Sequence, residues 1–262
     1  MIEFYDNDMS VCAQKVRLVL AEKDLTYNRV HLNLRAGDQF KPDYLKLNPK
    51  AVVPTIVHDG NVVIESTVII SYLEDVFGEP SLTPNTALHR AKMLQWMILP
   101  DAGLHDTCGL TSFALAFRKQ LATLEPDKLE AHYAKMPDEK RRNHVRTLVE
   151  QGLNAPGVDA ALRHYKRVIN SMEQALESAT WIAGETYSLA DVTMLPYVLR
   201  LEHLGLSWFW SESPRIEKWL EASRQRSNYD AITDHLDPKY LGIMSAGGVE
   251  NRQQIERVLD IS

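Results

Sequence analysis

Two side chains near the amino terminus, the hydroxyl of Ser10 and the thiol of Cys12, lie two residues apart where the sequence changes character. The stretch before them, "IEFY", is rich in aromatic and branched residues, as is typical of a β-strand. From Val11 to Leu25, apolar residues recur at helical spacing. We therefore expect Ser10 at a helix N-terminus, where free N–H groups and the helix dipole stabilise anions. A hydroxyl donor there favours a thiolate, which is the nucleophilic form of a thiol.

Cys12 has two interpretations that the sequence leaves open. Free cysteines are often small buried packing residues. The start of a helix would equally favour a reactive thiolate at this position. The chain has one other cysteine, Cys108, and neither belongs to a CxxC or a Cys/His metal-ligand spacing. The sequence therefore predicts no disulfide framework and no metal centre.

A second pair of residues, Glu65 and Ser66, precedes the apolar run "TVIISYLEDVF". Ser66 or Thr67 would most simply cap a helix here, and Gly78 would end it. The same helix start can instead hold a ligand carboxylate, while Glu65 accepts a hydrogen bond from an ammonium group beside it. That pair of charges suits an amino-acid head group.

Pro54, in the stretch "NPKAVVPTIV", can also be interpreted in two ways. A proline here can simply open an edge strand. A cis Val53-Pro54 bond, which is uncommon, would instead turn the backbone groups of Val53 outward toward a ligand. The proline alone does not decide between these interpretations.

The segments that carry these residues alternate between strand and helix patterns. A second strand is expected in "YNRVHLNL", and a short helix around "KPDYLKLN". Two apolar runs then flank an Asp59-Gly60 turn, which is a strong hairpin signal. The order β-α-β-α-β-β-α predicts a mixed sheet with helices on both faces.

The pattern changes after residue 79. A Pro- and Ser-rich stretch predicts a linker at 80–86, and residues 87–262 are helical in pattern. The polar residues around 118–156 predict an insertion within this helical domain, and the tail after Arg226 is expected to be irregular. Within "YSLADVTMLPYV", Ser188 and Asp191 have the spacing of a helix capping box.

Composition limits the class of protein. The chain has 262 residues, 45% of them hydrophobic and 24% charged, which is enough for a sizeable core and two domains. Its net charge of −6 and the acids around "EKRRNHVR" argue against a nucleic-acid partner. No apolar run approaches the ~20 residues that span a bilayer, and the N-terminal residues lack a basic stretch followed by an apolar core. We therefore expect a cytoplasmic protein with no membrane association.

Three motifs together resemble the glutathione S-transferase superfamily: Ser-x-Cys at a helix start, "LNPKAVVPTIVHDG", and "IESTVIISYLEDVF". The "YSLADVTMLPYV" stretch resembles the superfamily's recurring Ser-x-x-Asp helix start. The resemblance covers most of the chain. It implies a thioredoxin-like α/β domain at 1–79 followed by an all-α domain, with glutathione as co-substrate and a homodimeric assembly.

The resemblance also implies roles for individual residues. Ser10 would donate a hydrogen bond to the glutathione sulfur and so stabilise the thiolate. Without such help, a thiol of pKa ~8.5 is only a few per cent ionised at neutral pH. Each pKa unit of lowering corresponds to about 1.4 kcal/mol. Val53, ahead of Pro54, would pair its main chain with the cysteinyl unit, and Glu65 with Ser66 would hold the γ-glutamyl head.

Three further residues are assigned to the tripeptide by the same resemblance. Gln39 matches a glutamine that zeta-class members use, and Lys41 and Lys50 would face the glycyl carboxylate. Many members carry Gln directly before Val-Pro, where this chain has Val52. One expected side-chain contact is therefore missing, and Lys41 or Lys50 would replace it.

Two subgroups compete for the match. "NDMSVCAQKVRL" is similar to the tetrachlorohydroquinone reductive dehalogenases, in which a Ser-x-Cys pair is catalytic. "VHDGNVVIESTVIISYLEDVFGEPSLTP" is similar to the bacterial lignin β-etherases, which attack an aryl ether carbon with glutathione. Both place a glutathione thiolate against an aromatic or benzylic electrophile, and β-aryl ether cleavage is favoured. A non-catalytic glutathione-binding protein stays open as an alternative. An isomerase of the maleylacetoacetate type is disfavoured, because Val11 and Lys15 depart from the Ser-Ser-Cys-x-x-Arg start of those enzymes.

Overall fold

The computed structural model describes residues 1–136 and 138–260, which form two compact units, each built from separate stretches of chain. The first unit comprises Met1–Ile98, Ala175–Val198 and Glu217–Leu236. The second comprises Leu99–Gln174, Leu199–Ile216 and Asp237–Ser262.

A four-stranded mixed sheet forms the base of the first unit. Its strands follow the order β2-β1-β3-β4, in which β1 and β2 are parallel and the other neighbours are antiparallel. The bounds are β1 Ile2–Asp6, β2 Tyr27–His31, β3 Thr55–His58 and β4 Asn61–Ile64. Asp59 and Gly60, at φ 49° and 82°, form the turn between β3 and β4. Such left-handed values are typical of a tight hairpin turn, and the predicted hairpin is confirmed.

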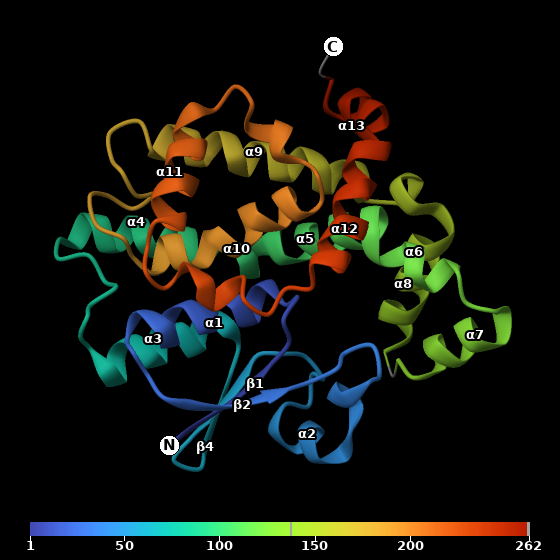
Figure 1. Ribbon diagram of the computed structural model, residues 1–262, viewed down its shortest axis with the longest axis horizontal. Helices are drawn as coiled ribbons and strands as arrows, with labels where there is room; N and C mark the ends of the chain where they lie inside the picture. The colour runs from blue at the N-terminus through green and yellow to red at the C-terminus, as the bar shows by residue number, and fades with distance from the viewer. Residues whose placement is uncertain (137, 261–262) are drawn as a thin grey trace. The chain divides into compact units, whose positions relative to one another are not determined.

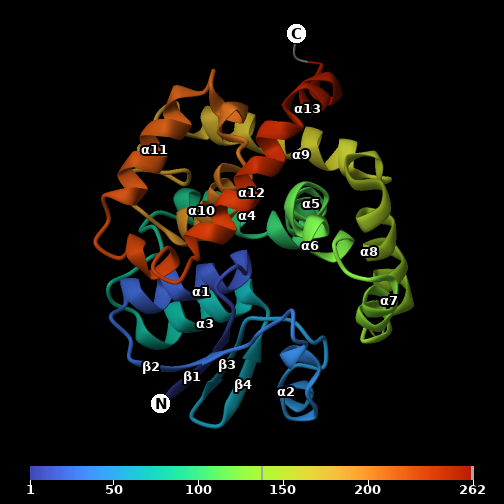
Figure 2. The same ribbon diagram turned by 45° about the vertical axis from the view of Figure 1, so that its right-hand side comes forward.

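Helices cover both faces of this sheet, as predicted. Helices α1 (Val11–Glu22) and α3 (Ser66–Phe77) lie side by side on one face (Figures 1 and 2). Helix α2 (Pro42–Leu47) covers the other face, where the ring of its Tyr44 lies 5.5 Å from that of Tyr5. Side chains alternate along a strand, so the buried Phe4 beside Tyr5 faces α1 and α3.

After β4, the regular elements of the described chain are helices joined by loops, with one isolated bridge between Trp181 and Gly184. The fold is therefore an α/β part followed by an all-α part, as predicted. Helices α10 and α11 each begin in one unit and end in the other. Within residues 1–136 and 138–260, no helix has the length and apolar character of a bilayer span. The remaining helices are α4 Ala87–Met97, α5 His105–Ser112, α6 Arg118–Ala122, α7 Pro126–Ala134, α8 Glu139–Gln151, α9 Val158–Ala175, α10 Leu189–His203, α11 Pro214–Arg224, α12 Pro238–Glu250 and α13 Arg252–Leu259.

The polar stretch around 118–156 forms α6, α7 and α8 in the second unit. Figure 2 shows α7 and α8 as a neighbouring pair. Arg146 of α8 forms an ion pair of 2.8 Å with Glu130 of α7, and its guanidinium lies 4.8 Å from the ring centre of the buried Tyr133. Asp138 caps α8 by accepting a hydrogen bond from the backbone N–H of Arg141.

The expectation of an irregular tail after Arg226 is wrong, because α12 and α13 occupy it. Asp237 caps α12 by accepting a hydrogen bond of 2.9 Å from the backbone N–H of Lys239. Gly247 and Gly248 are poor helix formers, and this weakens the local helix signal. Each lies so close to a distant backbone carbonyl, of Leu115 and Leu204 respectively, that a Cβ would come within 2.3 and 2.0 Å. This long-range packing keeps the segment helical.

The predicted capping box is confirmed at the start of α10. The Asp191 carboxylate accepts hydrogen bonds from the backbone N–H and the hydroxyl of Ser188, at 3.0 and 3.2 Å. It also accepts from the backbone N–H of Ile182 and from Nε1 of Trp219. Asp191 is fully buried, and its carboxylate joins the stretches 175–198 and 217–236 of the first unit.

Candidate functional site

Ser10 is the N-cap residue of α1, as predicted. Its Oγ accepts a hydrogen bond of 3.2 Å from the backbone N–H of Ala13. A hydroxyl has two lone pairs and one proton, so this capping bond leaves the O–H available to donate. Ser10 therefore presents a donor at the positive end of the α1 dipole.

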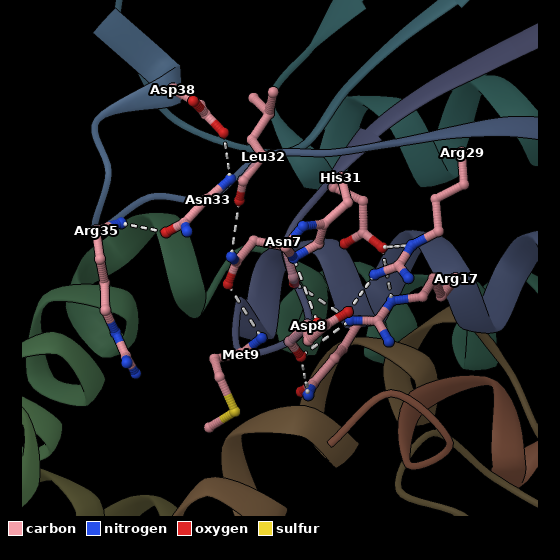
Figure 3. Close-up of polar contacts among 12 residues, drawn as sticks. Asn7, Asp8, Met9, Arg17, Arg29, His31, Leu32, Asn33, Arg35 and Asp38 are labelled. Atoms are coloured by element: carbon pink, nitrogen blue, oxygen red, sulfur yellow. Dashed lines mark hydrogen bonds and ion pairs between the residues drawn. The ribbon is translucent and has the colours of Figure 1, made fainter. Parts of the chain in front are cut away.

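The loop before Ser10 is held by hydrogen bonds to its own side chains and to the end of β2 (Figure 3). The Asn7 side chain donates to the backbone oxygen of Leu32 at 2.9 Å and accepts from the backbone N–H of Met9 at 3.1 Å. The backbone N–H of Ser10 donates to the Asn7 oxygen at 3.1 Å. The sheet therefore fixes the entry to α1.

Cys12 is the second residue of α1, two residues after Ser10, and is partly exposed. Its Sγ is 3.7 Å from the hydroxyl of Tyr197, a fully buried residue of α10. The ammonium of Lys15, also fully buried, lies 6.0 Å from the centre of the Tyr197 ring and donates to Oγ1 of Thr67 at 3.4 Å. A thiol, a phenol and a cation thus lie together. Sequence reasoning missed Tyr197 and the burial of Lys15, since only the fold brings α10 and α3 against α1.

The Val53-Pro54 peptide bond is cis, as the ligand-directed interpretation of Pro54 requires. Val53 is buried with Leu32 and Tyr44 in a cluster beneath α2. The hydroxyl of Tyr44 and the side-chain amide of Asn48 donate to the backbone oxygen of Val52 at 2.5 and 3.0 Å. These contacts fix the backbone that leads into β3.

The expectation that Ser66 or Thr67 caps α3 is wrong. Glu65 is the N-cap residue, and no side chain makes a capping hydrogen bond there, because Ser66 and Thr67 already lie inside the helix. Glu65 has φ 69° and ψ 113°, a left-handed value that is uncommon for a residue other than glycine. Such strained residues concentrate at ligand sites, and an uncapped helix start suits a carboxylate.

The other three candidates make contacts with nearby residues. The Lys50 ammonium lies 2.6 Å from a carboxylate oxygen of Glu65, and Lys41 pairs with Asp38 at 2.7 Å. The side-chain amide of Gln39 donates to the backbone oxygen of Leu34 at 3.1 Å.

The structure therefore brings some of the candidates together. Lys50 contacts Glu65, and the hydrogen bond from Lys15 to Thr67 ties α1 to the first turn of α3. Oε1 of Gln39 is buried with no partner among the described residues. A buried acceptor left unpaired costs about 1–3 kcal/mol, so Gln39 would gain from a ligand donor.

Comparison with known families identifies both parts of the chain. The family model "Glutathione S-transferase, N-terminal domain" matches residues 9–76. The family model "Glutathione S-transferase, C-terminal domain" matches residues 155–222. The N-terminal domain match therefore precedes the C-terminal domain match along the chain.

Individual relatives cover nearly the whole chain at low identity. Glutathione S-transferase TCHQD of Arabidopsis thaliana is 27% identical over 247 residues, which are 88% of this chain and 89% of the relative. The tetrachloro-p-hydroquinone reductive dehalogenase of Sphingobium chlorophenolicum is 24% identical, over 92% of this chain and 98% of the relative.

A third relative, LigF of Sphingobium sp. strain SYK-6, is similar in both sequence and structure. Its sequence is 29% identical over 175 residues, which are 66% of this chain and 68% of the relative. The crystal structure of beta-etherase LigF superimposes with a TM-score of 0.80 at 24% identity, covering 90% of this chain and 99% of that one. At this identity the structural likeness establishes the fold.

The co-substrate follows from the family. Glutathione S-transferases use glutathione as co-substrate. The described residues contain no group of three or more His, Cys, Asp or Glu side chains that could hold a metal ion. With both domain models matched in order, and with relatives that cover most of its length, this chain belongs to the glutathione S-transferase superfamily.

Proposed function

We propose that the protein is a glutathione transferase in which Ser10 stabilises the bound thiolate for attack on an aromatic or benzylic electrophile. The observation that carries this proposal is the geometry of Ser10. Its oxygen caps α1 while its O–H stays free to donate at the helix N-terminus. A donor and a helix dipole that act on one sulfur favour its ionised form.

The rest of the tripeptide would extend from Ser10 toward the start of α3. The uncapped N–H groups of α3, including that of Ser66, would receive the γ-glutamyl carboxylate, and Glu65 its ammonium. Val53, before Pro54, would pair with the cysteinyl backbone. Gln39, Lys41 and Lys50 remain the proposed contacts to the glycyl end. On binding, Lys41 would leave Asp38, and Lys50 would leave Glu65, to pair with the glycyl carboxylate of the ligand. The proposal keeps 1–79 as the glutathione-binding domain, 80–86 as the linker and 87–262 as the helical domain.

Glu65→Gln is expected to raise the dissociation constant of glutathione about tenfold or more, because a hydrogen bond to a charged group contributes about 1.5–3 kcal/mol. The pKa of the bound thiol should stay the same. Titration calorimetry and ultraviolet titration measure the two quantities. Asp75→Asn, which removes an exposed carboxylate from the same helix, is the matched control. Equal binding by both variants would remove Glu65 from the site.

Cleavage of a β-aryl ether is the favoured reaction, since LigF, which is 29% identical in sequence over 175 residues, is described in its solved structure as a beta-etherase. The glutathione thiolate would attack the carbon that bears the ether oxygen. A carbon–sulfur bond forms, the carbon–oxygen bond breaks, and a phenolate leaves and takes a proton. This reaction needs one glutathione and no second thiol.

Cys12 supports a second candidate, glutathione-dependent reductive dehalogenation. Its Sγ is partly exposed and lies beside the Tyr197 hydroxyl. The glutathione thiolate would first displace chloride from the ring, forming a carbon–sulfur bond as the carbon–chlorine bond breaks. The Cys12 thiolate would then attack the sulfur of this glutathionyl hydroquinone. The hydroquinone leaves with the bonding electron pair and takes a proton, and Cys12 is left in a mixed disulfide with glutathione. A second glutathione releases Cys12 as glutathione disulfide forms.

Cys12→Ser separates these candidates. With a β-aryl ether as substrate, turnover should stay within about twofold, because the etherase reaction has no step at Cys12. With a chlorinated hydroquinone, the variant should accumulate the glutathionyl conjugate, which mass spectrometry detects. Cys108→Ala is the matched control, since Cys108 is buried in the second unit. If the parent protein converts neither substrate, the proposed electrophile class is wrong.

The proposal includes a cytoplasmic homodimer, by likeness to the family. Sedimentation velocity of the full chain should give the mass of two subunits. A glutathione-binding protein without catalysis is the remaining alternative. Retention on a glutathione resin without thiolate formation in the bound tripeptide would favour that alternative.

A further inference from the structure

A buried arginine of α1 donates hydrogen bonds to the loop that leads to Ser10 (Figure 3). Arg17 of α1 is only 1% exposed. Its Nη2 donates to the backbone oxygens of Asn7 and Asp8, at 3.3 and 3.0 Å. The side chain therefore reaches back past Ser10 and holds the two carbonyls just before it.

A buried carboxylate holds this arginine in place. Oδ2 of Asp6, which is fully buried at the end of β1, lies 3.3 Å from Nε of Arg17. The same oxygen lies 2.7 Å from Nε of Arg29, which also pairs with the side chain of Asp8. Both arginines thus share Asp6, but Arg17 is the one that donates to the loop carbonyls.

The carbonyls held by Arg17 also accept hydrogen bonds from α1. The Asn7 oxygen accepts from the backbone N–H of Ser10 at 3.1 Å, and the Asp8 oxygen accepts from the side-chain amide of Gln14 at 3.2 Å. A shift of either carbonyl would therefore move the first turn of α1. Displacements near 1 Å at a reacting group can reduce rates about a hundredfold.

Residues 226–231, more than 200 positions farther along the chain, also contact α1. Nη1 of Arg17 donates to the backbone oxygen of Ala231, in the 3₁₀ turn η6 (Tyr229–Ile232), at 3.3 Å. Farther along α1, Glu22 accepts two hydrogen bonds from Arg226, at 2.9 and 2.6 Å. All these residues belong to the first unit, so the segment from 226 to 231 anchors the same helix twice.

We propose that Arg17 is a positioning residue for thiol activation: by holding the carbonyls of Asn7 and Asp8, it sets the direction in which Ser10 donates. This inference rests on the proposed function, because it assigns a role to Arg17 only if Ser10 acts on the glutathione sulfur. Arg17 itself lies behind the loop and does not contact the ligand in this proposal.

The experiment compares Arg17→Met with Arg29→Met in the full chain. Each variant removes one guanidinium from Asp6, but Arg17→Met alone removes the donors to the loop carbonyls. For folded protein well below its melting temperature, three quantities are measured: the pKa of the bound glutathione thiol by ultraviolet titration, the dissociation constant of glutathione, and the pH profile of turnover.

Arg17→Met is expected to raise the pKa of the bound thiol by about one unit and to lower turnover at neutral pH about tenfold. Turnover should recover at high pH, and Arg29→Met should change the thiol pKa by less than half as much. Arg17→Lys covers the case in which Arg17→Met does not fold. A lysine keeps the charge beside Asp6 but lacks the planar fork. It should therefore restore folding while the thiol pKa stays raised.

Two results would overturn the inference, and they have different consequences. If Ser10→Ala raises the thiol pKa while Arg17→Lys and any folded Arg17→Met leave it unchanged, Arg17 supports only the fold. If the parent protein binds glutathione with an ordinary thiol pKa near 8.5, the proposed function fails and the role of Arg17 fails with it.

Discussion

Ser10→Ala is expected to lower turnover at pH 7 about 10- to 100-fold and to leave the dissociation constant of glutathione nearly unchanged. The reason is that the variant removes the O–H that would stabilise the thiolate, whereas the tripeptide backbone and its charged ends keep their contacts. Ultraviolet titration of the bound thiol measures the cause directly, and the pKa should rise by one to two units.

Ser10→Thr is the matched variant, since it keeps both the hydroxyl and the cap of α1. Its thiol pKa should stay close to that of the parent protein. Turnover by Ser10→Ala should recover as the pH approaches 9, because solvent then ionises the sulfur. A thiol pKa that is the same in Ser10→Ala and the parent would exclude Ser10 from thiol activation.

Asp191→Ala is expected to lower the free energy of unfolding by about 3–5 kcal/mol. The change leaves the backbone N–H groups of Ile182 and Ser188 and the indole N–H of Trp219 buried without their acceptor. Urea unfolding followed by tryptophan fluorescence measures the loss. Asp159→Ala, at an exposed position in the first turn of α9, is the control and should change stability by less than about 1 kcal/mol.

The same carboxylate should leave a signature in the pH dependence of stability. Burial raises the pKa of Asp191 to about 6, although hydrogen bonds from Trp219, Ile182 and Ser188 act to lower it. The folded protein therefore binds the proton more tightly than the unfolded chain, whose Asp pKa is about 3.9. This contribution to stability is complete below pH 4 and is lost as the pH rises through 6.

Asp191→Asn removes this titration, so the two proteins should be compared at each pH. The difference in unfolding free energy between parent and variant should fall by about 1.4 kcal/mol for each pH unit between 4 and 6. Above pH 7 it should be constant. A difference that does not vary between pH 4 and 7 would mean that the folded carboxylate titrates normally.

Local sequence signals predicted the sheet and its turns well. The turn between β3 and β4 needs left-handed backbone angles, which Asp59 and Gly60 accept more readily than most residue pairs. Gly78, which ends α3, likewise has a positive φ of 58° that glycine adopts without strain. The position of Ser10 was equally readable, because a capping residue between a strand and an amphipathic run has one natural place. In each case the residue type itself constrains the backbone.

The surroundings of the site could not be predicted, because they depend on contacts between distant segments. Lys15, Arg17, Glu22 and Lys23 look like the charged residues of a surface helix, yet all four are buried. Each is compensated by a partner that only the fold supplies. These partners are Thr67, Asp6, Arg226 and Glu74, in the same order.

The two wrong predictions, the cap of α3 and the irregular tail after Arg226, also arise from contacts between distant segments. The sequence suggested Ser66 or Thr67 as the cap of α3, but Thr67 accepts its hydrogen bond from Lys15 and the helix starts one residue earlier. The tail after Arg226 was expected to be irregular, but Gly247 and Gly248 of α12 allow close packing against Leu115 and Leu204. Local propensity is a weak guide wherever tertiary packing decides the conformation.

The hydrogen bonds from Arg226 to Glu22 and from Arg17 to Ala231 have a consequence for biosynthesis. The proposed tripeptide-binding residues emerge early from the ribosome. Arg226, which pairs with Glu22, and Ala231, one of the acceptors of Arg17, follow about 200 residues after those two residues. Until then, the buried Glu22 carboxylate lacks its ion pair and Arg17 lacks one of its hydrogen-bond acceptors. Translation at about 5–20 residues per second makes that interval tens of seconds long. The nascent chain therefore completes its first unit only near the end of translation, although that unit begins at Met1.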